Sequence, residues 1–326
     1  MSARPELRVV FFGNSESVFS NRHFAALANS PCLVAAVVDV PPSGRTTTNT
    51  QTQAGGFVQP SFVDEGRDLG IPVFEPANPN QPEFVASLRR FKPDLFIAAG
   101  YTRLLKDDIL AVPKLVAANF HASLLPAYRG KHPLFWALRH GEHWAGLTVH
   151  VMAAGFDTGD ILYQVRVRTR RKDSVGTLYD RIMDRSVPLI PRLVTDASAG
   201  KLDRQPQGEV GASYFSSVSP DDFRLDWSQP AALLSRWVYA SPAQCYFDFA
   251  GQRIHLLDAD PSREPAPFPP GALASIGRTC FTVATGQGLL RLQRVRAQDR
   301  SVQTAAAWCR EARLRPGVIL AAGCQT

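Results

Sequence analysis

Short apolar runs alternate with helical patterns over residues 7–99, and this alternation limits the fold more than any other feature. The strand-like runs are residues 7–13, 32–38, 71–74 and 94–99, and the helical patterns between them are residues 18–28, 62–69 and 82–90. Continuous apolar runs of this length are typical of strands that helices bury on both faces. The alternation therefore predicts an α/β fold built on an open parallel sheet.

The chain is too long for most single hydrophobic cores, and its pattern changes along its length. It has 326 residues, of which 45% are hydrophobic and 20% charged, as in ordinary globular proteins. A long helical pattern covers 175–194, and a polar stretch with Pro and Gly follows at 205–211. A helix near 230–240 then precedes short strand-like runs at 246–249, 254–257, 280–285 and 289–295. We predict a catalytic domain at 1–204, a linker at 205–213 and a smaller C-terminal β-barrel domain at 214–326.

An amide, an imidazole and a carboxylate follow two apolar runs of the first domain. Asn119 and His121 stand at the end of the run 114–120, and Asp157 follows the run 146–152 after a short loop. Ligands of open α/β sheets bind outside the carboxyl ends of the strands, so we expect these side chains to meet at that edge. Together they can stabilise an oxyanion, move a proton and orient the imidazole. These are the requirements of acyl transfer to an amine.

The segments around these residues resemble the folate-dependent formyltransferases. The resemblance rests on Asn119-x-His121-x-Ser123-Leu124-Leu125-Pro126, then Arg129-Gly130, then Asp157-Thr158-Gly159-Asp160. Segments 224–228, 283–288 and 315–317 are similar to the C-terminal barrel of methionyl-tRNA formyltransferase and its two-domain relatives. The resemblance covers nearly the whole chain and implies a Rossmann-like formyltransferase fold in the first domain.

What the resemblance implies is a formyl donor, 10-formyltetrahydrofolate, and an amine acceptor, with no metal. Asn119 and a protonated His121 would donate to the oxygen of the formyl group, and Asp157 would favour the imidazolium or accept the amine proton. Ser123 and His150 would support this set, although His150 lies in an apolar run and a core histidine is an equal alternative. The pterin ring would contact Arg103, Leu104, Leu105, Met152, Ala153, Ala154 and Phe156.

The acceptor divides the family, and here the sequence favours a small-molecule amine such as an amino sugar or amino acid derivative. Methionyl-tRNA formyltransferases carry a basic loop after the second strand, whereas residues 41–60 hold only Arg45 as a charge. After Arg129-Gly130 they usually have small Ala-Pro residues, whereas this chain has Lys131-His132-Pro133. Methionyl-tRNA remains the second candidate. Two alternatives to a transferase stay open: a hydrolase that releases formate, and a non-catalytic binding module.

Other features exclude several functions. The apolar runs are too short to cross a bilayer and the N-terminus has no signal-peptide core, so we expect no membrane contact and a cytoplasmic location. Five cysteines without a CxxC spacing predict free thiols rather than a zinc site. The net charge of +7 is spread along the chain, and its densest cluster, 168–172, is typical of a solvated turn. The sequence contains neither a GxGxxG nor a Walker A motif, so it gives no sign of a nucleotide cofactor.

Overall fold

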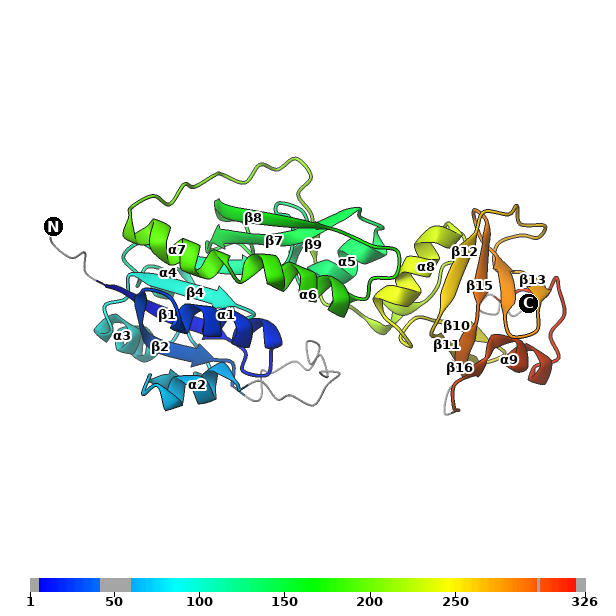
Figure 1. The fold of residues 1–326 in the computed structure, drawn as a ribbon, viewed down its shortest axis with the longest axis horizontal. Helices are drawn as coiled ribbons and strands as arrows, with labels where there is room; N and C mark the ends of the chain where they lie inside the picture. The colour runs from blue at the N-terminus through cyan, green and yellow to red at the C-terminus, as the bar shows by residue number, and fades with distance from the viewer. Residues whose placement is uncertain (1–5, 42–59, 298–299, 321–326) are drawn as a thin grey trace. The chain divides into compact units, whose positions relative to one another are not determined.

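The computed structural model describes residues 6–41, 60–297 and 300–320 (Figure 1). The chain divides into two compact units, each of which we describe by itself. The N-terminal unit comprises residues 1–130, 145–167 and 179–215, and the C-terminal unit comprises 131–144, 168–178 and 216–326. The predicted loop at 41–60 lies, apart from its end residues, outside the described part of the chain.

The N-terminal unit is built on a seven-stranded sheet with the order β3-β2-β1-β4-β5-β7-β8. Its strands are β1 (Leu7–Gly13), β2 (Cys32–Asp39), β3 (Val73–Phe74), β4 (Leu95–Ala99), β5 (Val116–His121), β7 (Trp144–Val151) and β8 (Ile161–Arg168). β1 to β5 pair in parallel. The predicted α/β fold is confirmed, and β1 begins and ends at the predicted residues.

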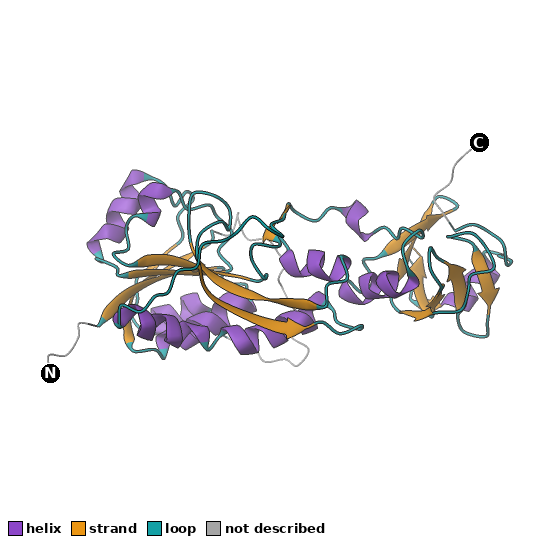
Figure 2. Ribbon diagram, turned by 90° about the horizontal axis from the view of Figure 1, so that it is seen from above, coloured by secondary structure: helices purple, strands orange, loops and turns teal. Residues whose placement is uncertain are grey.

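Helices cover both faces of this sheet (Figure 2). They are α1 (Val18–Ala28), α2 (Phe62–Asp68), α3 (Pro82–Arg90), α4 (Asp107–Leu110), α6 (Val175–Ser186) and α7 (Leu189–Ser198). Adjacent residues of β1 point to opposite faces. Phe11 packs against Phe24 of α1 and Phe62 of α2, whereas Phe12 packs against Phe96 in the core that α3 and α4 cover. The continuous apolar run of β1 is explained because both of its faces are buried.

Three details of the N-terminal unit differ from the sequence prediction. β7 is antiparallel to β5, so Asp157 does not follow the carboxyl end of a parallel strand. The helical pattern at 175–194 is two helices, because Pro188 has no N–H with which to continue a helix from α6 into α7. β8 was not predicted, since only every second residue or so is apolar and its outer positions are charged or polar.

The C-terminal unit contains two four-stranded antiparallel sheets, β10-β11-β16-β17 and β12-β15-β14-β13. Its elements are α5 (Pro133–Arg139), η3 (Pro220–Phe223), α8 (Ala231–Ala240), β10 (Tyr246–Phe249), β11 (Gln252–Leu256), β12 (Ala259–Ser262), β13 (Leu273–Ile276), β14 (Phe281–Ala284), β15 (Leu289–Leu292), β16 (Arg294–Ala297), β17 (Gln303–Thr304) and α9 (Ala305–Glu311). Side chains of both sheets join α8 and α9 in one core. The predicted strand at 289–295 is divided at Gln293 between the two sheets.

Candidate active site

Asn119 and His121 occupy alternate positions of β5 and therefore face the same side of the sheet. The antiparallel register places Asn119 opposite His150 of β7 and His121 opposite Thr148. His150 is therefore a direct cross-strand neighbour of Asn119. Its side chain is only 2% exposed, but its ring faces polar partners and not an apolar core.

Asp157 reaches this face through the loop that follows β7. The loop is closed where the amide of Val151 donates to the carbonyl of Asp160 at 2.8 Å. Gly159 has no room for a side chain, because a Cβ there would lie 1.9 Å from the carbonyl oxygen of Val151. Asp157 itself has a φ of 54°, which is uncommon for a residue with a side chain. This loop returns the carboxylate to β5, although β7 runs in the opposite direction.

The structure brings the three predicted catalytic side chains together and places His150, predicted as a supporting residue, in contact with them. Asp157 Oδ2 is 3.6 Å from His121 Nδ1, and Asp157 Oδ1 is 3.3 Å from His150 Nε2. Asn119 Nδ2 lies 3.5 Å from Asp157 Oδ1 and 3.1 Å from His150 Nε2. Two buried imidazoles, a partly buried amide and a partly buried carboxylate thus form one polar cluster.

Burial and charge set the protonation of the cluster. Burial lowers the pKa of His121, and the charge of Asp157 only partly opposes this effect. Burial acts to raise the pKa of Asp157, but His150, His121 and the amide of Gly130 together lower that pKa to about 2. The carboxyl is therefore ionised at neutral pH, and the free protein favours a neutral His121. The predicted imidazolium differs from this resting state because burial outweighs the attraction of Asp157.

The tautomer of His121 follows from its second contact. Its Nε2 is 2.8 Å from the carbonyl oxygen of Tyr128, which can only accept, so Nε2 carries the hydrogen. In the neutral ring, Nδ1 then has a free lone pair on the side of Asp157. A neutral His121 can therefore accept a proton at Nδ1.

Ser123 orders the turn after β5 and does not hold the ring of His121. Its hydroxyl donates to the carbonyl of Ala127 at 2.8 Å. Thr148 Oγ1 donates to the carbonyl of Ser123 at 2.7 Å, and Gln164 Nε2 donates to the carbonyl of Leu125 at 3.0 Å. Thr148 and Gln164 were missed in the sequence, because one polar residue in a strand gives no sign that its partner is a turn.

The predicted pterin-binding residues form two segments with mixed exposure. The side chain of Leu105 is 1% exposed and packs in the core, where Met152 also packs, so Leu105 can offer a ligand only its backbone. Leu104 and Phe156 are 41% and 55% exposed, and Ala153 and Ala154 are also exposed. Exposed apolar side chains suit the faces of a flat ring.

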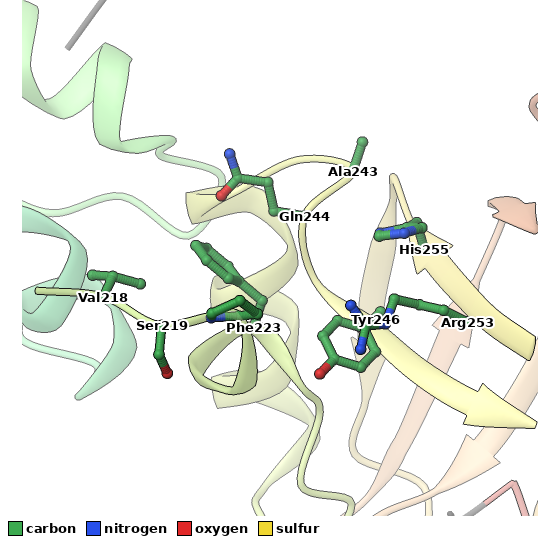
Figure 3. A pocket seen from close by; sticks show the side chains of 9 residues that line it. Val218, Ser219, Phe223, Ala243, Gln244, Tyr246, Arg253 and His255 are labelled. Atoms are coloured by element: carbon green, nitrogen blue, oxygen red, sulfur yellow. The ribbon is translucent and has the colours of Figure 1, made fainter. Parts of the chain in front are cut away.

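A pocket of about 350 Å³ belongs to the C-terminal unit and contains none of the predicted site residues (Figure 3). Phe223, Tyr246, Arg253 and His255 contribute to its lining. The guanidinium of Arg253 lies 3.8 Å from the centre of the Tyr246 ring.

In residues 6–41, 60–297 and 300–320, no group of three or more His, Cys, Asp or Glu side chains is arranged to hold a metal ion. None of the helices in these ranges is both long and apolar enough to span a bilayer.

Comparisons with known proteins agree with this architecture. Residues 7–194 match the family model "Formyl transferase", and residues 217–313 match "Formyl transferase, C-terminal domain". Methionyl-tRNA formyltransferase from Synechococcus sp. (strain JA-3-3Ab) is 32% identical over 96% of this chain and 98% of the relative. The same enzyme from Pseudomonas entomophila (strain L48) is 35% identical over 89% of this chain and 91% of the relative.

A similar fold occurs in a solved N-formyltransferase from Helicobacter canadensis, which was crystallised with folinic acid and dTDP-3-aminofucose. Its TM-score is 0.65 at 15% identity, with 90% of this chain and all of that one covered. The family models alone cover most of the sequence. The chain therefore belongs to the folate-dependent formyltransferase family.

Proposed function

We propose that the protein transfers the formyl group of 10-formyltetrahydrofolate to a primary amine of a small molecule. The observation that carries the proposal is the cluster of Asn119, His121 and Asp157. It joins a hydrogen-bond donor, a proton acceptor and a fixed negative charge on one face of the sheet. Such a set supports acyl transfer to nitrogen without a covalent enzyme intermediate.

The geometry supports a separate role in the reaction for each of the three side chains. The amine attacks the formyl carbon, and negative charge develops on the formyl oxygen, to which Asn119 Nδ2 donates. His121 Nδ1 accepts the amine proton, because Nε2 carries its hydrogen toward the carbonyl of Tyr128. Asp157, 3.6 Å away, stabilises the imidazolium that forms. The new C–N bond then remains, the C–N bond to the folate breaks, and His121 returns its proton to the folate nitrogen.

The donor would contact the exposed part of the two predicted segments. Leu104 and Phe156 offer apolar surface to the pterin, and the backbone at Arg103 and Met152–Ala154 offers donors and acceptors. Leu105 supports this surface from the core. Titration with 5-formyltetrahydrofolate tests this part: Phe156→Ala should weaken binding, and the exposed Leu69→Ala, in the N-terminal unit, should not.

Methionyl-tRNA is the second candidate acceptor, and the sequence comparisons favour it. The two relatives described above are methionyl-tRNA formyltransferases, and they match this chain through both domains. Two features of the sequence count against methionyl-tRNA. Residues 41–60 hold only one charge, Arg45, and Lys131-His132-Pro133 stands where small Ala-Pro residues are usual in those enzymes. Phosphate contacts require Lys or Arg, so this loop is a poor surface for the acceptor stem.

Release of tetrahydrofolate from 10-formyltetrahydrofolate distinguishes the candidates. The proposal is supported if release is slow without an acceptor, slow with methionine-charged initiator tRNA, and rapid with one of a panel of amino sugars and amino acids. If charged tRNA strongly stimulates the release, the acceptor is methionyl-tRNA and not a small amine. Rapid release without any acceptor identifies a hydrolase and overturns both.

A further inference from the structure

The segment 205–215, most of which we predicted as a linker, is hydrogen-bonded to the loops that hold the active site. Gln205 pairs through its backbone with Ile161, directly after the loop that carries Asp157. Ser213 accepts from the amide of Tyr128 through Oγ at 2.9 Å and from the amide of Arg129 through its carbonyl at 2.8 Å. The two residues after Ser213 form β9 (Tyr214–Phe215), which pairs in parallel with β6 (Arg129–Gly130).

Gln207 lies between these two attachments and contacts the Asp157 loop directly. Its Nε2 donates to the carbonyl of Asp157 at 2.8 Å and to the carbonyl of Gly159 at 2.6 Å. Its Oε1 accepts from Arg129 Nη2 at 3.0 Å and Nε at 3.3 Å. A guanidinium has no acceptor and a carbonyl no hydrogen, so only this orientation of the amide satisfies all four contacts.

Asp157 needs such support because of its backbone. Its φ of 54° is sparsely populated by residues with a side chain, and such conformations persist only where the surroundings determine them. The Gln207 amide binds the carbonyl of this very residue and of the residue two positions later. The side chain of Asp157 is held separately, by the amide of Gly130 at 2.8 Å.

We propose that Gln207, oriented by Arg129, is a positioning residue for formyl transfer: it holds the Asp157 loop so that the carboxylate faces His121. This inference rests on the proposed function for its catalytic consequence, but its structural consequence can be measured without any turnover. Loss of the clamp frees the loop, and the hydrogen bond from the Gly130 amide to Asp157 then opens more often. The carboxylate also loses its fixed position beside Nδ1, which costs rate more than it costs folate binding.

Gln207→Met tests the clamp because it keeps the length of the side chain and removes all four contacts. Gln207→Glu keeps an acceptor for Arg129 but loses both donors, so it should behave like Gln207→Met. Gln205→Met is the matched control: the same residue type, exposed, on the same segment, with its pairing to Ile161 made by the backbone. Amide hydrogen exchange would be followed at Gly130 and, as an internal reference, at Met152, whose amide donates to the carbonyl of Ala117.

We expect exchange at Gly130 to accelerate about tenfold in both Gln207 variants, with Met152 unchanged and 5-formyltetrahydrofolate affinity within about threefold. The kcat for tetrahydrofolate release, with charged initiator tRNA or hydroxylamine as the amine, should fall about 10²-fold. Three results would overturn the proposed role of Gln207. They are unchanged exchange at Gly130, equal acceleration at Gly130 and Met152, and a Gln207→Glu variant that behaves like the wild type. A wild-type protein that transfers no formyl group, but whose Gly130 amide responds as expected, would overturn only the proposed function.

Discussion

Replacement of Asp157 by Asn removes one negative charge from the active site and keeps the shape of the side chain. The carboxylate contacts the amide of Gly130, His121 Nδ1 and His150 Nε2 through two oxygens, whereas an Asn has a single side-chain oxygen that can accept. The imidazolium of His121 would form without a compensating charge. By analogy with triads in which a carboxylate orients a histidine, kcat should fall by about 10³–10⁴-fold.

The same substitution should cost stability, and the cost can be worked from the pKa. The pKa of Asp157 falls from the ordinary 3.8 to about 2 in the folded protein, which favours the ionised form by about 2 kcal/mol. The side chain is 14% exposed, so solvent screens this interaction little. Because the folded pKa is the lower one, the stabilisation is complete well above pH 4 and disappears as the pH falls through about 2.

Urea denaturation of both proteins at pH 7 and at pH 3 measures this contribution. We expect Asp157→Asn to be less stable than the wild type at pH 7 by at most about 2 kcal/mol, since a neutral His121 contributes less than an imidazolium, with a clearly smaller difference at pH 3. Equal stabilities at pH 7 would refute the argument that the cluster stabilises the charged carboxylate. A kcat within about threefold of the wild type would refute its role beside His121.

Three further predictions concern other parts of the N-terminal unit. Asn119→Ala and His121→Ala should each lower transfer at least about 10²-fold with an unchanged circular dichroism spectrum; near-normal turnover of His121→Ala would exclude it as the base. Gly159→Ala should lower the free energy of unfolding by about 1–3 kcal/mol, because its Cβ would meet the carbonyl of Val151, and a neutral result in urea would show that the loop adapts. Arg45→Ala should leave formyl transfer nearly unchanged, and a large loss with charged tRNA alone would favour that acceptor.

The part of the fold that the sequence predicts well is the part determined by local patterns. Residues 18–28 and 82–90 form the predicted helices with the predicted ends, and the second begins with Pro82, which is favoured in the first turn of a helix. Strand direction is different, because it depends on pairing between distant segments. Nothing in the run 146–152 shows that β7 lies antiparallel to β5. The division of 289–295 at Gln293 likewise reflects the closure of two sheets and not a local signal.

The candidate active site shows the same limit at the level of single residues. Asn119 and His121 could be predicted because their spacing on one strand fixes their common face. Asp157 was expected beside them from the carboxyl ends of parallel strands, but β7 is antiparallel to β5, and the loop after β7 returns the carboxylate to this face. His150 carried a weak signal as a polar residue in an apolar run, and the cross-strand register decides that its partners are Asn119 and Asp157.

Gln207 carried no signal, and the reason bears on how this enzyme is built. Its neighbours Pro206 and Gly208 are residues of loops, so composition alone assigns the segment to a linker. The segment nevertheless lies between the two regions that match the family models, at 194 and 217, and it is attached to both loops of the active site. The backbone of Asp157 is therefore held by the chain that connects the first matched region to the second. The segment is thus tied to the sheet by the backbone of Gln205, at the first residue of β8, and to the Asp157 loop by the side chain of Gln207.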